Sequence, residues 1–150
     1  MIKEEGVLEG DYVPGALYGL HVFPSPACII ACKQELFMAA SDGLYIKVKG
    51  VQTRVSLPWG GVDPITTSAQ IISALQTIVS RQKDISNAPA VVTIGSINGG
   101  NRGNIIPQAV EMTGTIRTFD RKMRDDVHAR IKRTAELVAK ALAQTRKLPL

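Results

Sequence analysis

The sequence is poor in aromatic residues, in cysteine and in long apolar runs, and each shortage excludes a class of protein. Phe, Trp and Tyr make up 5% of the 150 residues, so few side chains could stack on exposed nucleic-acid bases. Two cysteines cannot build a disulfide framework and fit a reduced, cytoplasmic protein. The uncharged stretch around Val13–Ala27 is interrupted by proline and glycine, so no membrane span is expected. The first residues, MIKEEG, lack the apolar segment of a signal peptide.

The remaining composition is that of a globular protein. Hydrophobic residues make up 45% of the chain and charged residues 21%, which excludes a disordered or collagen-like chain. A chain of 150 residues has the size of one domain, or of one small domain with an appendage. It is long enough to bury a sizeable core.

The net charge of +5 is unevenly distributed along the chain. Residues 1–63 carry 5 basic and 7 acidic side chains, whereas residues 64–150 carry 13 basic and 6 acidic ones. A basic half favours nucleic-acid binding. Much of this positive charge, however, lies between Arg121 and Lys140 and is interleaved with acidic residues, which is typical of a solvated helix face. A basic nucleic-acid-binding domain is therefore only the third of our functional hypotheses.

Residues 1–40 consist of short apolar pieces separated by glycine and proline. Tyr18–Phe23 is predicted to form a short buried strand, and Cys28–Cys32 a second one. The two cysteines have no second pair of Cys or His at zinc-site spacing, so we interpret them as small apolar strand residues. Because no helical pattern lies nearby to cover these strands, the region resembles part of something larger.

From Ser41 onward the pattern predicts regular elements. Leu44, Ile46 and Val48 alternate along the chain with Tyr45, Lys47 and Lys49, as in a half-buried strand. Asp63 is placed to cap a helix whose first residue is Pro64. The helical stripe ends near Arg81 and consists of Ile65, Ala69, Ile72, Leu75 and Val79.

The second half of the chain repeats this alternation of strands and a helix. Ala90–Ile97 is predicted to be a strand with a bulge at Gly95, and 98–103 a turn. The next strand buries alternate residues over 110–117. Asp120 is expected to cap a long helix that extends to Leu142. Two helices and three antiparallel strands predict an α+β fold, a two-layer sandwich in which both helices cover one face of the sheet.

Few residues have the types and spacing of a catalytic site, and nucleotide-binding loops, nucleophile elbows and zinc-protease motifs are absent from the sequence. His21 lies in an apolar run and is either a hydrogen-bonded core residue or one metal ligand. His128 is expected on the surface of the second helix. Asn104 and Arg117 could bind a carboxylate together, or Arg117 could simply pair with Glu111 or Asp120.

Several stretches together resemble the metal-dependent amidohydrolases that include hippurate hydrolase, N-acyl-amino-acid deacylases and indole-acetyl-amino-acid hydrolases. This family belongs to the aminoacylase and glutamate-carboxypeptidase clan. The matching stretches are YGLHVFPS (18–25), MAASDGLYIKVKG (38–50), PWGGVDPI (58–65), ALQTIVSRQ (74–82), VVTIG (91–95), NIIP (104–107) and GTIRTFD (114–120). They cover nearly the whole chain but only the middle of such an enzyme.

The resemblance implies a division into two parts. Family members insert a smaller βαββαβ domain, which acts as lid and dimerisation surface, into an α/β catalytic domain. By resemblance, 1–40 is a fragment of the catalytic domain. The segment 41–150 is the ferredoxin-like βαββα(β) lid and dimerisation domain, which we expect to lack its last strand.

The resemblance also assigns roles to four residues. His21 matches a metal-binding histidine of the family's GLH motif. Asn104 and Arg117 match residues that contact the substrate's carboxylate or the tetrahedral intermediate. Arg54 stands where the family has a histidine that reaches into the partner's active site and stabilises the oxyanion. The longer arginine fork cannot reproduce the imidazole's position or its proton exchange.

We therefore expect a truncated or split portion of an amidohydrolase that hydrolyses N-acyl amino acids or peptide-like amides and is inactive alone. An intact family member binds two divalent ions, zinc or manganese, but the motifs that supply the other ligands and the general-base glutamate are missing here. We expect no metal on this chain alone. The expected partner is a second copy bound through the lid domain; the alternative function is a non-enzymatic homodimerisation module.

Overall fold

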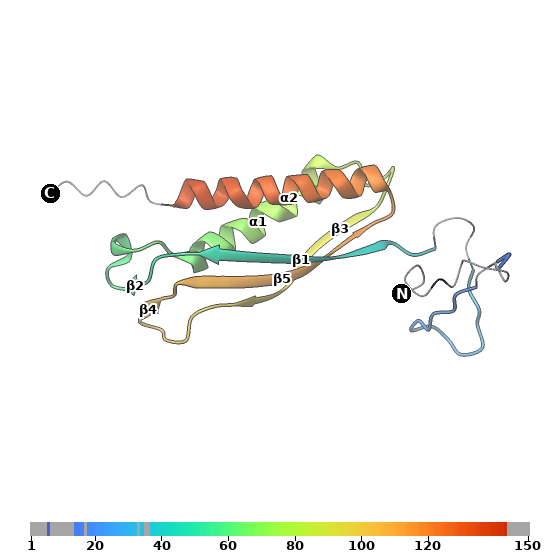
Figure 1. Ribbon diagram of the computed structural model, residues 1–150, viewed down its shortest axis with the longest axis horizontal. Coiled ribbons are helices and arrows are strands. Elements are labelled where there is room, and N and C mark those ends of the chain that lie inside the picture. Colours follow the sequence, from blue (N-terminus) through green and yellow to red (C-terminus); the bar gives the residue numbers. More distant parts are fainter. Residues whose placement is uncertain (1–5, 7–13, 17, 33, 35–36, 144–150) are drawn as a thin grey trace. The chain divides into compact units, whose positions relative to one another are not determined.

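The computed structural model describes residues 6, 14–16, 18–32, 34 and 37–143, and the chain divides into two compact units. The first unit is Met1–Cys32 and the second is Lys33–Leu150. Figure 1 shows the helices and strands of the second unit. No helix of the described residues is long and apolar enough to cross a bilayer.

The two strands expected in the first unit are not formed. Tyr18–Phe23 and Cys28–Cys32 have irregular, exposed backbone, and the Tyr18 side chain is 97% exposed. An apolar strand is stable only when a neighbouring strand pairs with it and another layer covers it. The described residues of this unit supply neither, so the prediction of buried strands was wrong.

The second unit contains the predicted antiparallel sheet. Its strands are β1 (Ala40–Lys49), β5 (Ala109–Thr118) and β3 (Ala90–Asn98), in the spatial order β1-β5-β3. In β1 and β5, buried residues alternate with more exposed ones, as the sequence pattern predicts. The sheet therefore has one face toward the core and one open face.

The bulge predicted at Gly95 is confirmed. Up to Ile94, β3 pairs with β5 in one register, and from Ser96 it continues in a register shifted by one residue. The added residue lies between these two positions, where it changes which side chains face the core. Beyond the bulge, Ile97 is 48% exposed.

Two helices cover the same face of the sheet, which confirms the predicted two-layer α+β fold (Figure 1). In α1 (Pro64–Gln82), the Asp63 side chain accepts hydrogen bonds from the amides of Ile65 and Thr66. In α2 (Arg121–Leu142), the Asp120 carboxylate accepts one from the amide of Met123. Both predicted N-caps are formed, because each carboxylate satisfies amides that have no partner within the helix.

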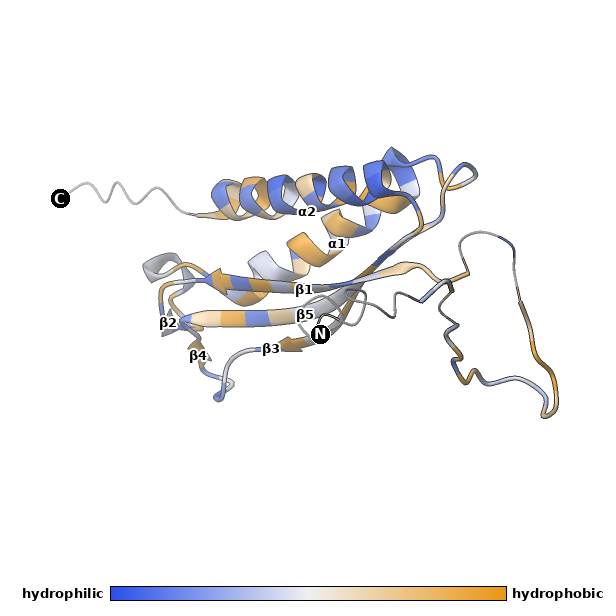
Figure 2. Cartoon of the chain, turned by 45° about the vertical axis from the view of Figure 1, so that its right-hand side comes forward, coloured by the Kyte–Doolittle hydropathy of each residue, from blue (hydrophilic) through white to orange (hydrophobic). Residues whose placement is uncertain are grey.

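The core lies between the helices and the sheet. Figure 2 shows hydrophilic colour on the outer side of α2 and hydrophobic colour on strand segments beneath the helices. The side chains of Leu75 and Ile78 on α1 and of Val127 on α2 are fully buried. The other members of the buried cluster are Leu44, Val48, Ile71, Val92, Val110, Met112, Ile116 and Ile131. Burial of these apolar side chains is the main force that fixes the helices on the sheet.

The loop that follows β1 begins at Gly50, where the backbone passes very close to other backbone segments. The Gly50 amide donates to the carbonyl of Gln108 at 2.8 Å. A Cβ atom on Gly50 would lie 2.3 Å from the carbonyl oxygen of Val62, so only glycine fits there. Val51 and Val62 then form an isolated antiparallel bridge. This loop leads to the short strand that contains the first candidate site residue.

Candidate functional site

Arg54 and Asn104 lie together on a two-stranded ribbon that the sequence did not predict. It consists of β2 (Thr53–Arg54) and β4 (Ile105–Ile106), which are antiparallel, with Arg54 opposite Ile105. The ribbon continues one residue further, because the amide of Val55 donates to the carbonyl oxygen of Asn104 at 3.2 Å. The structure therefore brings two of the four candidate residues to one end of the second unit.

A tight turn holds Arg54 in place. The amide of Leu57 donates to the Arg54 carbonyl at 2.9 Å, and the Thr53 hydroxyl donates to the carbonyl of Leu57 at 3.1 Å. The short 3-10 helix η1 (Pro58–Gly60) follows directly. Because the main chain is bonded at these points, the exposed Arg54 side chain extends from an ordered backbone.

A polar hollow of about 620 Å³ lies beside this ribbon. Its polar lining comes from Gln52 before β2 and from Asn101, Arg102 and Gln108 around β4. Segments 50–62 and 98–110 contain two arginines and no acidic residue. Amides and guanidinium groups without a neighbouring carboxylate make this end of the unit suited to contact an anionic or carbonyl-bearing ligand.

Arg117 lies at the opposite end of the sheet. It is paired with Ser41 of β1 and Val91 of β3, whereas the β4 end of β5 begins at Ala109. These two positions are eight residue steps apart along the strand, roughly 27 Å at about 3.4 Å per residue. A single copy therefore does not bring Arg117 and Asn104 to the same small ligand.

The simpler role considered for Arg117, an ion pair with Glu111 or Asp120, is not what the structure shows. The Glu111 carboxylate accepts a hydrogen bond from Lys47 at 2.7 Å, and Asp120 caps α2. The half-buried Arg117 donates from Nη1 to the carbonyl of Ile116 at 3.2 Å. Arg117 lies on the open face of the sheet, away from the helices, as the alternation predicted.

His21 belongs to the first unit, where its side chain is exposed. Its Nδ1 lies 2.5 Å from the carbonyl oxygen of the adjacent Val22. Because the side chain is exposed, His21 is not the buried core histidine that its apolar neighbours indicated. Among the described residues, no three His, Cys, Asp or Glu side chains are grouped so that they could hold a metal ion. A catalytic ion needs about three protein ligands. The residues described here do not fit a metal centre.

The structure also shows a charged cluster that sequence analysis missed. The Asp42 carboxylate on β1 accepts hydrogen bonds from Nε and Nη2 of Arg124 on α2, at 2.7 and 2.6 Å. Nε2 of His128 lies 3.2 Å from the same carboxylate, so this 40% exposed side chain has a partner on β1. Arg124 and His128 are four residues apart and therefore share one helix face. This spacing is the sequence feature from which the cluster could have been predicted.

This cluster lowers the pKa of the Asp42 carboxyl to about 2. The hydrogen bond from Arg124 is the largest cause, and that from His128 acts in the same direction. Both favour the ionised form over the protonated form, and together they outweigh the opposing effect of burial. Asp42 is therefore ionised throughout the physiological range and serves to tie β1 to α2.

Other basic residues of α2 also have partners within the unit. Arg130 donates from Nε to Asp126 at 2.9 Å and from Nη1 to Gln82 at 2.8 Å. Lys83, after α1, forms an ion pair with Asp126; burial, and then the Arg130 guanidinium, lower the pKa of Lys83. These contacts join the two helices and leave fewer cations free for a phosphate backbone, which weakens the nucleic-acid hypothesis.

Comparison with known proteins matches the second unit to a described family. The family model for the peptidase dimerisation domain matches residues 40–145. The N-acetyl-L-cysteine deacetylase of Bacillus subtilis is 38% identical over 143 residues, which are 95% of this chain and 33% of that protein. The N-acetyldiaminopimelate deacetylase of Leuconostoc mesenteroides is 36% identical over 137 residues, 91% of this chain and 35% of that protein.

A solved structure agrees with these matches. The Bacillus subtilis YXEP protein, described as a dinuclear metal-binding peptidase of the M20 family, superposes with a TM-score of 0.66 at 33% identity. The match covers 94% of this chain and 33% of that one. The chain thus spans about a third of the length of the relatives it matches.

Proposed function

The chain belongs to the M20 family of metallo-amidohydrolases through its peptidase dimerisation domain, and we propose that it acts as the substrate lid and dimerisation part of an enzyme that hydrolyses N-acyl amino acids. The deacetylase names of the two relatives support this substrate class. Divalent metal occurs in the family, as the dinuclear relative indicates. In the whole enzyme we propose zinc or manganese, which would lower the pKa of an attacking water.

The separation of the candidate residues along β5 carries the proposal. Arg54 and Asn104 lie at one end of the second unit and Arg117 at the other. All three can contact one substrate only if two copies contribute, one supplying Arg117 and the other supplying Arg54 and Asn104. A lid with this layout therefore requires the dimer that the family description names.

Each residue has a chemical role in such a shared site. The planar fork of Arg117 matches a substrate carboxylate with two parallel hydrogen bonds. The Asn104 amide adds a neutral donor for the same carboxylate or for the tetrahedral intermediate. Arg54 provides a cation near the developing oxyanion, at the position where the family resemblance implies a histidine. Its charge supports the intermediate, but a guanidinium does not exchange protons at neutral pH.

The chain by itself is proposed to be inactive. The described residues hold no group of three metal-ligating side chains, and His21 alone cannot retain a pair of ions. We expect no hydrolysis of N-acetyl or hippuryl amino acids with zinc or manganese added. Turnover that is lost on chelation and in His21→Ala would overturn this part of the proposal.

Complementation between two inactive variants tests the shared site. Residues 40–145 would replace the corresponding domain of the Bacillus subtilis N-acetyl-L-cysteine deacetylase, and Asn104→Ala and Arg117→Ala would be made separately in that chimera. If each site uses Arg117 of one copy and Asn104 of the other, mixed dimers contain one intact site, and mixing restores about a quarter of the activity. If both residues act from the same copy, mixing restores nothing.

A non-enzymatic homodimerisation module is the second candidate function. The same lack of a metal-ligand group among the described residues favours it. The two functions differ in one respect: only the enzyme lid depends on Arg117 and Asn104, whereas a dimerisation module needs neither. An active chimera that is insensitive to both substitutions would favour the module.

A further inference from the structure

We propose that the polar hollow beside β2 and β4 binds a second carboxylate of the substrate, through the guanidinium of Arg102. The substrate is then an N-acyl amino acid with an acidic group besides its α-carboxylate, on the amino-acid side chain or at the end of the acyl group. This inference rests on the proposed function, in which Arg117 and Asn104 hold the α-carboxylate. It adds a residue that selects among substrates.

The hollow lies on the face of the ribbon that carries Arg54. Gln52 lines the hollow two residues before Arg54, and alternate residues of an extended chain share a face. Arg54 is paired with Ile105, another lining residue, and paired residues of neighbouring strands also project to one face. A ligand in the hollow is therefore next to the cation that we propose near the oxyanion.

Arg102 is close to Asn104 both in the chain and in space. The amide of Ile105 donates to the Arg102 carbonyl at 3.3 Å, which closes a four-residue turn that contains Asn104. The Cα atoms of Arg102 and Asn104 are two residue steps apart, so at most about 7 Å separates them. One copy therefore supplies Arg54, Arg102 and Asn104 to the shared site, together with the partner's Arg117.

The loop before Arg102 has a fixed backbone. Gly100 has a φ of +78°, a conformation that residues with a side chain rarely adopt. A Cβ on Gly99 would lie 2.6 Å from Cγ2 of Val110, so the loop packs closely against β5. Asn101 and Arg102 therefore extend from an ordered loop, and less conformational entropy is lost when a ligand binds.

The exposed Arg102 side chain forms no ion pair within the described part of the chain. The acidic residues that directly follow segments 50–62 and 98–110 are Asp63 and Glu111, and both have other partners. Asp63 caps α1, and Glu111 accepts a hydrogen bond from Lys47 at 2.7 Å. The planar fork of Arg102 is therefore free to hold a carboxylate with two parallel hydrogen bonds.

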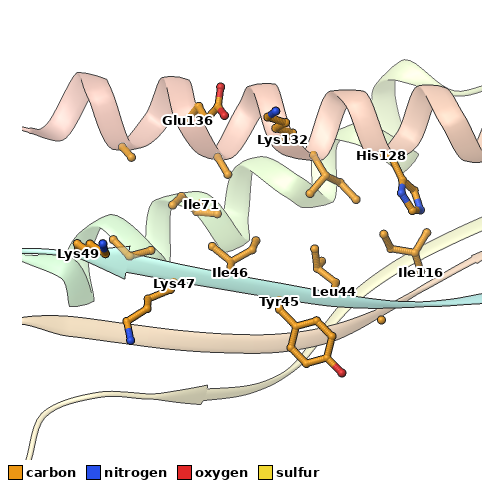
Figure 3. A pocket seen from close by; sticks show the side chains of 15 residues that line it. Leu44, Tyr45, Ile46, Lys47, Lys49, Ile71, Ile116, His128, Lys132 and Glu136 are labelled. Carbon is orange, nitrogen blue, oxygen red and sulfur yellow. The ribbon is translucent and has the colours of Figure 1, made fainter.

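The size and lining of the hollow suit a small polar ligand. Its volume of about 620 Å³ is typical of small-molecule sites. The side chains of Gln52, Asn101 and Gln108 add amide groups that can donate to carboxylate oxygens. The groove of about 580 Å³ between β1 and α2 differs, because Leu44 and Ile46 point toward the helices there (Figure 3). That groove continues the apolar core and does not suit a small anion.

An NMR titration of the full chain tests whether the hollow binds a carboxylate. The probes are Nα-acetyl-L-glutamate and Nα-acetyl-L-glutamine, which have similar shapes but differ in the charge of the side chain. We expect the glutamate compound to shift the amides of Gln52, Asn101 and Arg102 and to bind about tenfold more tightly. Equal shifts by sulfate at the same concentration would overturn the proposal, because the hollow would then be a general anion site.

A second pair of probes distinguishes the acyl group from the side chain as the source of the carboxylate. N-succinyl-L-alanine carries the extra carboxylate on its acyl group, and the corresponding terminal amide is its neutral match. The pair whose binding depends on this charge identifies the source and supports the proposal. Absence of any charge dependence in both pairs would overturn it.

Matched variants locate the binding group. Arg102→Gln should weaken binding of the charged probe about tenfold, and Arg102→Lys, which keeps the charge but loses the fork, should have a smaller effect. Arg81→Gln removes the same charge in the last turn of α1 and should leave binding unchanged. Equal affinity of Arg102→Gln and Arg81→Gln for the charged probe would contradict the proposal.

Activity of the chimera separates this inference from the proposed function. Arg102→Gln in the chimera should lower the ratio of kcat/KM for the charged substrate to that for its neutral match about tenfold. An active chimera in which this ratio does not change would overturn the inference and leave the proposed lid function intact. An inactive chimera, with Arg102-dependent binding in the full chain, would overturn the lid function and support a carboxylate site in the hollow.

Discussion

The Asp42 carboxylate receives both Nε and Nη2 of Arg124, at 2.7 and 2.6 Å, across 82 positions of the sequence. This bidentate contact joins β1, at the edge of the described sheet, to α2. It lies at the end of β1 where Ser41 pairs with Arg117, so it also fixes the strand beside that candidate residue. The local energetics of this pair lead to the first prediction.

Asp42→Asn should lower the midpoint of thermal unfolding at pH 7. The pKa of Asp42 is lowered from 3.8 to about 2 in the folded chain, so the stabilisation is complete above about pH 5. It is lost as the pH falls toward 2, because the folded chain then also takes up the proton. The difference between wild type and variant should therefore shrink over this range and vanish below it. Glu111→Gln, which breaks an exposed pair with Lys47, is the control with a smaller effect.

Leu75→Ala should reduce the free energy of unfolding by about 2–5 kcal/mol, because the side chain is fully buried between α1 and the sheet and its loss leaves a cavity. Urea unfolding followed by circular dichroism measures this. Leu137→Ala, at a side chain that is 52% exposed, should change the value by about 0.5 kcal/mol at most. Equal effects at the two positions would mean that Leu75 is not in the core.

Thr118→Val should leave stability unchanged or raise it by up to about 1 kcal/mol. The Thr118 hydroxyl is buried and has no hydrogen-bond partner in the described part of the chain, so valine removes an uncompensated polar group. Thr67→Val is the matched control: its buried hydroxyl donates to the Asp63 carbonyl at 2.7 Å, and its loss should cost about 1 kcal/mol. A larger loss at Thr118 than at Thr67 would contradict the packing described here.

Gly50→Ala should destabilise the chain by more than about 2 kcal/mol, because the added Cβ would lie 2.3 Å from the Val62 carbonyl oxygen and against Pro64. Gly95→Ala should have little effect, since a Cβ at the bulge meets no atom within 4 Å. Thermal unfolding of both variants tests the pair. A Gly50→Ala variant as stable as Gly95→Ala would show that the loop after β1 can move away without cost.

Local signals in the sequence were sufficient for the regular elements. Asp63 followed by Pro64 predicts a helix start because the carboxylate and the missing N–H act within one turn. Alternation in β1 and β5 and the bulge at Gly95 are likewise properties of neighbouring residues. The ribbon of β2 and β4 has two residues per strand and no period, so nothing in the sequence predicts it.

The sequence by itself determined the two-layer fold, its caps and the resemblance to amidohydrolases, because these depend on short spacings. Only the tertiary structure decided that Asn104 lies beside Arg54 and far from Arg117, that Asp42 joins Arg124, and that Tyr18–Phe23 is exposed. Each of these depends on which segments distant in the chain become neighbours. That choice is made by burial of the whole core and by strand register, which no single stretch of residues contains.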